Sequence, residues 1–316
     1  MDILEPKSTL NLYGYNYYFK SFIKLFKTQK LPKVMLLSGP KGLGKSTFSY
    51  HFINYILSQE EKYQYSLNEF VINSENSSYK LVLNNTHPSL FVLDDSLSVK
   101  NIKIDQVRNL LKFLTKTSSS KNIKIVLIDN SEYLNINASN ALLKSLEEPP
   151  SNTYFIIINN DTCALLETIK SRCVLFKINF NFNDKKNIFY NLKNKNDLDF
   201  DDSGLELLLN YDTPGNILKY FLLLKESKIN ISEDSLLCIN YLIEKVKTSN
   251  DHNLIDILTL FIEFFYTQLS LNNSKNINRY FFNKYRILRL IYDMRKFNLD
   301  KKSLFNVVSG ILKNEK

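Results

Sequence analysis

Residues 34–47 read VMLLSGPKGLGKST, and this stretch decides the fold of the chain. Residues 39–46 fit the pattern G-x-x-x-x-G-K-[ST] without a mismatch, and in that pattern a glycine-rich turn joins a strand to a helix. An apolar run of strand length, residues 34–37, precedes the match. Apolar residues follow it at helical spacing, namely Phe48, Phe52, Tyr55 and Ile56. This context predicts a phosphate-binding loop between a strand and a helix.

The loop has the residue types that bind nucleotide phosphates. The candidate residues are Gly39, Gly42, Gly44, Lys45, Ser46 and Thr47. The glycines let the backbone approach a ligand and point its N–H groups at an anion, and the following helix brings its positive end to the same place. We expect Lys45 to reach the β- and γ-phosphates and Ser46 to bind Mg²⁺. ATP and Mg²⁺ are therefore the predicted ligands, and the alternative is a turn that no longer binds nucleotide.

A second apolar strand brings a carboxylate toward the same place. Residues 123–128 read IKIVLI, which is typical of a central strand in a parallel sheet, and Asp129 follows them. Ligands of open α/β sheets bind at the carboxyl ends of the strands, so Asp129 is a candidate Mg²⁺ residue together with Ser46. The next residue is Asn130, whose amide can align a water molecule but cannot act as a general base. We interpret Glu132 as structural and expect it to face away from the site.

A third buried strand is predicted over residues 154–158, and we expect Asn160 beyond its end to reach the γ-phosphate or its water. Asp105 is the expected N-cap of a helix that ends near residue 114, and Asn137 is the expected N-cap of another. The remaining patterns predict a helix over 17–26, a short strand over 80–84, a strand over 90–93, a polar loop over 117–121 and only helices from residue 233 onward.

Composition narrows the class of protein. The chain has 316 residues, of which 44% are hydrophobic and 23% charged, as in an ordinary globular protein. It has no run of about 18 apolar residues and no signal-peptide core, so we expect a cytoplasmic protein without a membrane partner. Its cysteines, Cys163, Cys173 and Cys238, form no C-x-x-C pair, so no zinc is expected. The net charge of +9 indicates either a nucleic-acid partner or a biased, Lys- and Asn-rich composition.

A resemblance to a known family rests on two further motifs. Residues 140–150 read NALLKSLEEPP, and Ser171-Arg172-Cys173 follows about twenty residues later. Together they resemble the bacterial clamp-loader branch of the AAA+ ATPases, which contains the gamma/tau and delta-prime subunits of DNA polymerase III. The resemblance is clearest from residue 12 to residue 178. Residues 86–90 and 104–108 are more similar to the delta-prime type.

The resemblance implies an α/β fold with three parts. These are an AAA+ P-loop parallel-sheet domain over residues 1–179, a small helical lid over 180–230 and an all-α collar over 231–316. Many members carry a four-cysteine zinc module between the loop and the Asp129 strand. This chain has no cysteine before Cys163, so the segment 58–85 must be held in another way.

The resemblance also implies a function. Clamp loaders are multi-subunit arcs that open a sliding clamp and close it on primed DNA. The implied partners are a gamma/tau ATPase, a delta subunit, the clamp and, through the complex, primed DNA. By this resemblance Arg172 is an arginine finger that acts in trans on a neighbour's ATP, a role that supplies roughly 10³–10⁵ in rate.

Two departures from the family pattern bear on activity. Asn130 stands where gamma/tau carries Glu, and Leu218 stands where a lid arginine is expected, with Lys219 beside it. We therefore expect a delta-prime-like subunit that binds ATP weakly or statically and is not a catalyst by itself. Two alternatives stay open: an active gamma/tau-like ATPase, and a DNA-binding module with a vestigial nucleotide site. The sequence leaves open whether Glu132 or Lys219 replaces a missing residue.

Overall fold

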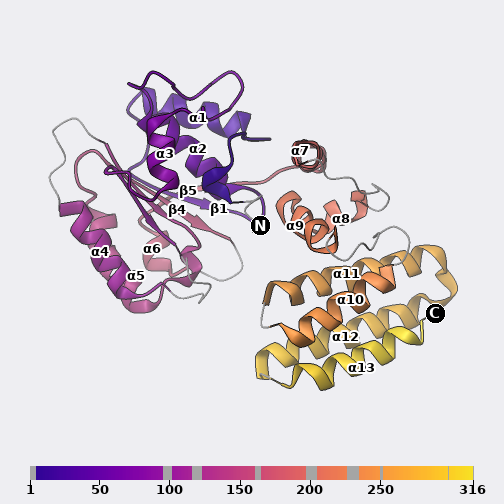
Figure 1. Cartoon of the computed structure of the whole chain (residues 1–316). Helices are drawn as coiled ribbons and strands as arrows, with labels where there is room; N and C mark the ends of the chain where they lie inside the picture. The colour runs from indigo at the N-terminus through magenta and orange to yellow at the C-terminus, as the bar shows by residue number, and fades with distance from the viewer. Residues whose placement is uncertain are drawn as a thin grey trace. The chain divides into compact units, whose positions relative to one another are not determined.

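The computed structural model describes residues 5–94, 102–115, 123–160, 165–196, 205–225, 235–249, 252–297 and 299–315. Two units make up the chain, Met1–Asn191 and Leu192–Lys316 (Figure 1). The division into residues 1–179, 180–230 and 231–316 stays a prediction, because its second boundary falls outside the described ranges.

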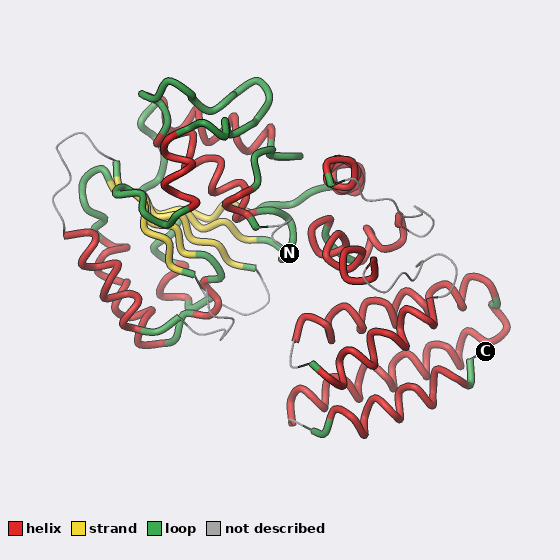
Figure 2. The backbone as a smooth tube through the Cα atoms, viewed as in Figure 1, coloured by secondary structure: helices red, strands yellow, loops and turns green. Residues whose placement is uncertain are grey.

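A five-stranded parallel sheet forms the centre of the first unit (Figure 2). Its strands are β1 (Val34–Ser38), β2 (Leu90–Leu93), β3 (Lys124–Ile128), β4 (Thr153–Asn159) and β5 (Val174–Lys177). They lie in the order β2-β3-β4-β1-β5. In the register, Ile158 of β4 is opposite Leu37 of β1, and Ile157 is opposite Ile128 of β3. The residues that follow β1, β3 and β4 therefore meet at one edge of the sheet.

Helices cover both faces of this sheet (Figure 1). One face carries α1 (Asn16–Lys27), α2 (Lys45–Leu57) and α3 (Ser77–Leu83); the other carries α4 (Ile104–Thr115), α5 (Ile136–Glu147) and α6 (Glu167–Lys170). The central strands alternate between the two layers, since Met35 and Leu37 pack in the first and Val34 and Leu36 in the second. This observed architecture confirms the predicted α/β class.

The segment between α2 and α3 is held by an aromatic ring and by helix capping. Tyr65 is buried, and its ring lies 5.1 Å from that of Phe19. The Glu61 carboxylate accepts hydrogen bonds from the backbone N–H groups of Ser77 (2.7 Å) and Ser78 (2.9 Å) at the start of α3. These contacts hold the segment without cysteine ligands, as expected for a chain that has no cysteine before Cys163.

The strand predicted over residues 80–84 is wrong, because α3 occupies that position. Asn76 caps this helix, and its side-chain oxygen accepts from the N–H of Tyr79 at 2.7 Å. Tyr79 and Val82 are both buried, and a spacing of three places them on one helical face.

Two predicted N-caps are also corrected. Asn135, not Asn137, caps α5: its backbone is extended and its side chain accepts from the N–H of Ala138 at 2.8 Å. Asp105 lies in the first turn of α4, which begins at Ile104. The predicted loop over 117–121 lies outside the described residues.

The second unit is helical in its described residues. Helix α7 (Phe182–Lys195) crosses the boundary between the units. The helices after it are α8 (Leu205–Tyr211), α9 (Pro214–Lys225), α10 (Ser235–Thr248), α11 (His252–Asn272), α12 (Ile277–Phe297) and α13 (Lys301–Lys313). Short 3₁₀ helices occur in both units, at Pro6–Ser8 and Ser131–Tyr133 in the first and at Ser274–Asn276 in the second. The last four helices pack side by side, with α10 and α12 each contacting α11 and α13 (Figure 1).

Helix α11 is apolar for most of its length. By length and composition alone, its segment Leu254–Asn272, with a mean hydropathy of 1.5, is able to cross a membrane. However, 56% of this segment is buried inside the structure, and one such helix is weak evidence because core helices pass the same test. The expectation that the chain has no membrane partner stays a prediction.

Candidate nucleotide-binding site

The glycine-rich loop lies between β1 and α2, as predicted. A Cβ atom at Gly39 would lie 2.5 Å from the carbonyl oxygen of Ile178, which leaves no room for a side chain. Gly44 has φ of +87° and is the N-cap of α2, so its left-handed backbone starts the helix. Both positions therefore require glycine for the loop to take this path.

Lys45 is buried inside this loop. The residue is only 3% exposed, and its Nζ donates to the carbonyl oxygens of Gly39 (2.6 Å) and Pro40 (2.8 Å). The ammonium thus stands at the amino-terminal end of α2, where the loop turns around it. Gly42 lies in the same loop, and Thr47 follows Ser46 in the first turn of α2.

Ser46 and Asp129 come together although they are 83 positions apart. The Ser46 Oγ donates to Oδ2 of Asp129 at 2.7 Å, and the N–H of Asn130 donates to Oδ1 at 2.9 Å. Burial raises the pKa of the Asp129 carboxyl, and the charges of Asp94 and Glu132 raise it further, whereas the two hydrogen bonds lower it. The result is a buried carboxylate beside a hydroxyl at the carboxyl edge of the sheet.

Asn160 lies at the same edge, and its side-chain amide has two acceptors. Its Nδ2 donates to Oδ1 of Asn130 (2.8 Å) and to Oε1 of Glu132 (2.9 Å), and its backbone N–H points at Oε2 of Glu132 (3.4 Å). The expectation that Glu132 faces away is therefore wrong. Asn130 has φ of 53°, a left-handed conformation that asparagine tolerates, and the chain reverses there so that Glu132 returns to the sheet.

Arg172 lies at a different place on the sheet. It comes just before β5, at the amino edge of the strands, whereas the loop after β1 is at the carboxyl edge. Five residues of β1 separate the two edges by about 16 Å at roughly 3.3 Å per residue. Arg172 thus cannot contact a nucleotide in its own loop.

The guanidinium of Arg172 is held by a residue that sequence reasoning did not single out. Its Nε donates to Oε1 of Glu147 at 2.8 Å and its Nη1 to the carbonyl oxygen of Thr168 at 2.7 Å; Nη2 also pairs with Glu147. Glu147 belongs to the NALLKSLEEPP motif at residues 140–150, so membership of this motif was the one sequence signal that could have pointed to it.

The remaining candidate positions, Leu218 and Lys219, belong to the second unit. In its helix α9, Leu218 is fully buried and Lys219 is exposed. A buried aliphatic residue therefore occupies the position at which the family resemblance led us to expect a lid arginine. Within the described ranges, no group of three His, Cys, Asp or Glu side chains is placed to hold a metal ion.

Comparison with known proteins decides the family. The family model described as DNA polymerase III, delta subunit, matches residues 15–181, more than half of the chain. The chain belongs to this family. The matched range contains the phosphate-binding loop and all five strands of the sheet.

Individual relatives agree with this assignment. The chain is 40% identical over 139 residues to DNA polymerase III subunit delta' of Pseudomonas aeruginosa, covering 44% of this chain and 40% of the relative. It is 29% identical over 237 residues to subunit gamma of Buchnera aphidicola, covering 72% of this chain and 62% of the relative. The chain therefore spans between 40% and 62% of the length of these two relatives.

A solved structure agrees with the fold. A DNA polymerase III gamma subunit-related protein from Thermotoga maritima covers 93% of this chain, and 99% of that protein is matched, with a TM-score of 0.50 and 20% identity. At this identity the likeness shows the fold alone.

Proposed function

We propose that this chain is a delta-prime-type subunit of a clamp loader. In this role it assembles with gamma/tau-type and delta-type subunits, helps to load a sliding clamp on primed DNA, and offers Arg172 to the ATP of a neighbouring subunit. The observation that carries the proposal is the position of Arg172 at the edge of the sheet opposite its own loop. The guanidinium is held there by Glu147 and lies at the opposite edge from its own nucleotide site, and the Arg172 side chain is 28% exposed, so we infer that it serves another subunit.

The chain's own loop would hold ATP. The residues fit a magnesium nucleotide, because the Ser46 hydroxyl and the Asp129 carboxylate are the hard oxygen ligands that Mg²⁺ prefers and lie 2.7 Å apart. Lys45 would exchange its carbonyl partners for the β- and γ-phosphates, and the N–H groups of the loop and of α2 would receive the remaining oxygens. Bound Mg²⁺ supplies positive charge that neutralises the phosphates.

Hydrolysis at this site would be slow. Asn130 holds the position after Asp129, and an amide cannot take a proton from water. Both hydrogens of the Asn160 amide are already donated, to Asn130 and to Glu132, so neither is directed at a phosphate or a water. Glu132 is used as an acceptor for Asn160. These contacts support a subunit that binds ATP without turning it over rapidly.

The competing function is an active gamma/tau-like ATPase, and the intact Lys45, Ser46 and Asp129 favour it. It differs from our proposal in one measurable way, since the isolated chain would then hydrolyse ATP. A DNA-binding module is the third candidate, and only the net charge of +9 favours it. Tight DNA binding by the isolated chain with a steep salt dependence would identify that module.

Assembly tests the proposal. The full chain is mixed with gamma/tau-type and delta-type subunits, and native mass spectrometry gives the composition of the complex. We expect one copy of this chain in each complex, no stable complex of this chain alone, and at most slow ATP turnover by the isolated chain. Rapid turnover by the isolated chain, at about 1 per second or faster, or failure to enter the complex, would contradict the proposal.

A further inference from the structure

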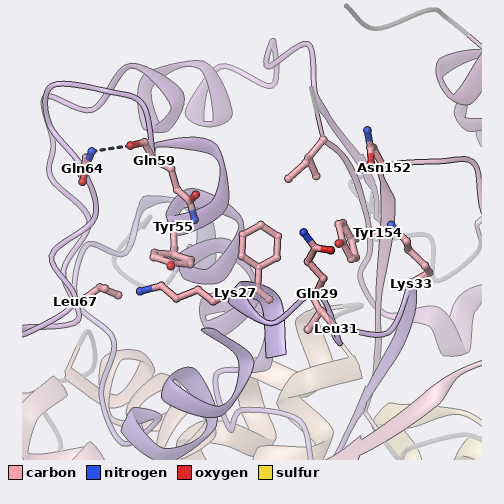
Figure 3. A pocket seen from close by; sticks show the side chains of 12 residues that line it. Lys27, Gln29, Leu31, Lys33, Tyr55, Gln59, Gln64, Leu67, Asn152 and Tyr154 are labelled. Carbon is pink, nitrogen blue, oxygen red and sulfur yellow. Dashed lines mark hydrogen bonds between the residues drawn. The ribbon is translucent and has the colours of Figure 1, made fainter. Parts of the chain in front are cut away.

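A hollow lies at the amino edge of the sheet, opposite the nucleotide site (Figure 3). Its volume is about 790 Å³, which is in the range of ligand-binding pockets. Its walls are the end of α1, the end of α2 and the residues that precede β1, β3 and β4, such as Lys33, Ile123 and Asn152. Because the hollow lies at the amino edge, none of its lining residues belongs to the phosphate-binding loop.

A second hollow continues the first along α1. Its volume is about 510 Å³, and Lys27 and Leu67 line both. Ile23 and Phe70 form apolar wall in the second hollow, as Phe26 and Tyr55 do in the first. The two hollows therefore adjoin at Lys27 and Leu67, and we call the pair the α1 groove.

The charged residues that line the α1 groove are all positive. Four lysines line it, and no carboxylate does. Lys20, Lys24 and Lys27 share one face of α1 at positions i, i+4 and i+7, and Lys33 stands at the far end. None of the four forms an ion pair within the described residues. Such a groove is complementary to an anionic partner.

The walls distinguish between two kinds of anionic partner. The Nζ of Lys33 lies 4.2 Å from the centre of the Tyr154 ring, and the Phe26 ring lies 6.1 Å from that ring. Phe26 and Tyr55 meet edge to face at 6.4 Å. The rings thus pack on one another and are not open platforms for nucleic-acid bases.

The polar rim suits a peptide. Gln29, Gln59, Gln64 and Asn152 contribute side-chain amides to the first hollow, and an amide can both donate to and accept from a peptide backbone. The Nε2 of Gln64 already donates to the carbonyl oxygen of Gln59 at 2.6 Å, as the dashed line in Figure 3 shows. Figure 3 shows the Gln29 side chain beside Tyr154 and the Lys27 side chain extended toward Leu67. An apolar centre with a polar rim is the usual anatomy of a protein–protein interface.

We propose that the α1 groove binds an extended acidic peptide of a partner protein. One apolar side chain of the peptide enters each hollow, and its carboxylates pair with Lys27, Lys33 and the α1 lysines. The groove is a docking site that neither ATP binding nor Arg172 requires.

The test is fluorescence anisotropy with the full chain and a labelled, glutamate-rich peptide that carries one leucine and one phenylalanine. Lys27→Glu reverses the charge shared by both hollows and is expected to weaken binding at least about tenfold. The matched control is Lys112→Glu, an exposed lysine of α4 on the other face of the sheet, which is expected to leave the affinity within about twofold. Leu67→Ser, which removes the shared apolar wall, should also weaken binding.

Two further probes make the result decisive. A peptide with glutamine in place of glutamate should bind at least about tenfold more weakly. Oligothymidylate should not displace the labelled peptide. The proposal is overturned if the peptide does not bind at millimolar concentration, if the glutamine peptide binds equally well, if Lys27→Glu behaves like Lys112→Glu, or if oligothymidylate displaces the peptide.

Discussion

Replacing Asp129 by asparagine should stabilise the chain in the absence of nucleotide. Burial raises the pKa of this carboxyl, so the folded state binds its proton more tightly than the unfolded state does. A raised folded pKa contributes stability below the unfolded value of 3.8, and this contribution is lost as the pH rises through the folded pKa. At neutral pH the wild-type chain therefore carries a buried charge that Asp129→Asn removes, while the amide oxygen can accept from the Asn130 N–H and the amide N–H can donate to the Ser46 hydroxyl.

The expected gain in the free energy of unfolding is about 1–2 kcal/mol, within the range commonly seen for single stabilising substitutions. For a unit of this size it corresponds to a rise in Tm of about 2–8 °C. With magnesium and ATP bound, the wild-type chain should be the more stable of the two proteins. At a ligand concentration about 100 times Kd the wild-type chain gains about 2.7 kcal/mol, whereas Asp129→Asn has lost a carboxylate oxygen for Mg²⁺ and gains little.

Thermal unfolding with and without magnesium and ATP, at pH values from 4 to 8, measures both effects. The stability gap between Asp129→Asn and wild type should grow as the pH rises. Glu69→Gln, which neutralises an exposed carboxylate, is the control and should change stability by less than about 0.5 kcal/mol. A less stable apo Asp129→Asn at pH 7, or equal stabilisation of both proteins by magnesium and ATP, would refute the reasoning.

Three other substitutions test two side-chain contacts and one partly buried histidine. Glu147→Gln should lower ATP turnover by an assembled loader about tenfold, because Arg172 loses its charged partner, and Glu148→Gln next to it should have little effect. Glu132→Ala should lower the free energy of unfolding by about 1.5–3 kcal/mol in chemical denaturation, since a bond to a charged acceptor is lost; an unchanged midpoint would contradict the observed contact. Burial lowers the pKa of His87, so the unfolded chain takes up a proton that the folded chain rejects, and stability should fall as the pH drops below 6.5. His87→Asn should reduce this slope by up to about 1.4 kcal/mol per pH unit, measured by denaturation at several pH values.

The phosphate-binding loop was predictable because a local pattern encodes it. Residues 34–47 specify the strand, the turn and the helix within a single short stretch, and the pairing of Ser46 with Asp129 follows from two parallel strands that end at one edge. The strand wrongly predicted over 80–84 shows the limit of periodicity, because a short apolar run fits a strand or a helix equally well. Only the cap at Asn76, together with Glu61 far from it in sequence, decides for the helix.

The contact between Glu132 and Asn160 was not predictable in the same way. It depends on the left-handed turn at Asn130 and on the neighbouring positions of β3 and β4, and neither has a local signal. The pairing of Arg172 with Glu147 likewise joins two motifs that the sequence shows 25 residues apart. These two side-chain contacts were therefore beyond the sequence patterns, although Asn160 and Arg172 had themselves been singled out as candidates.

The most direct test of the account is ATP turnover by a reconstituted loader with clamp and primed DNA, with Lys45→Ala and Arg172→Ala compared in this chain. The account predicts that Arg172→Ala lowers turnover strongly, by roughly 10³-fold at the site it serves, and that Lys45→Ala changes it little. If Lys45→Ala is the damaging change and Arg172→Ala is not, the chain is a working ATPase and the proposed role of Arg172 is wrong.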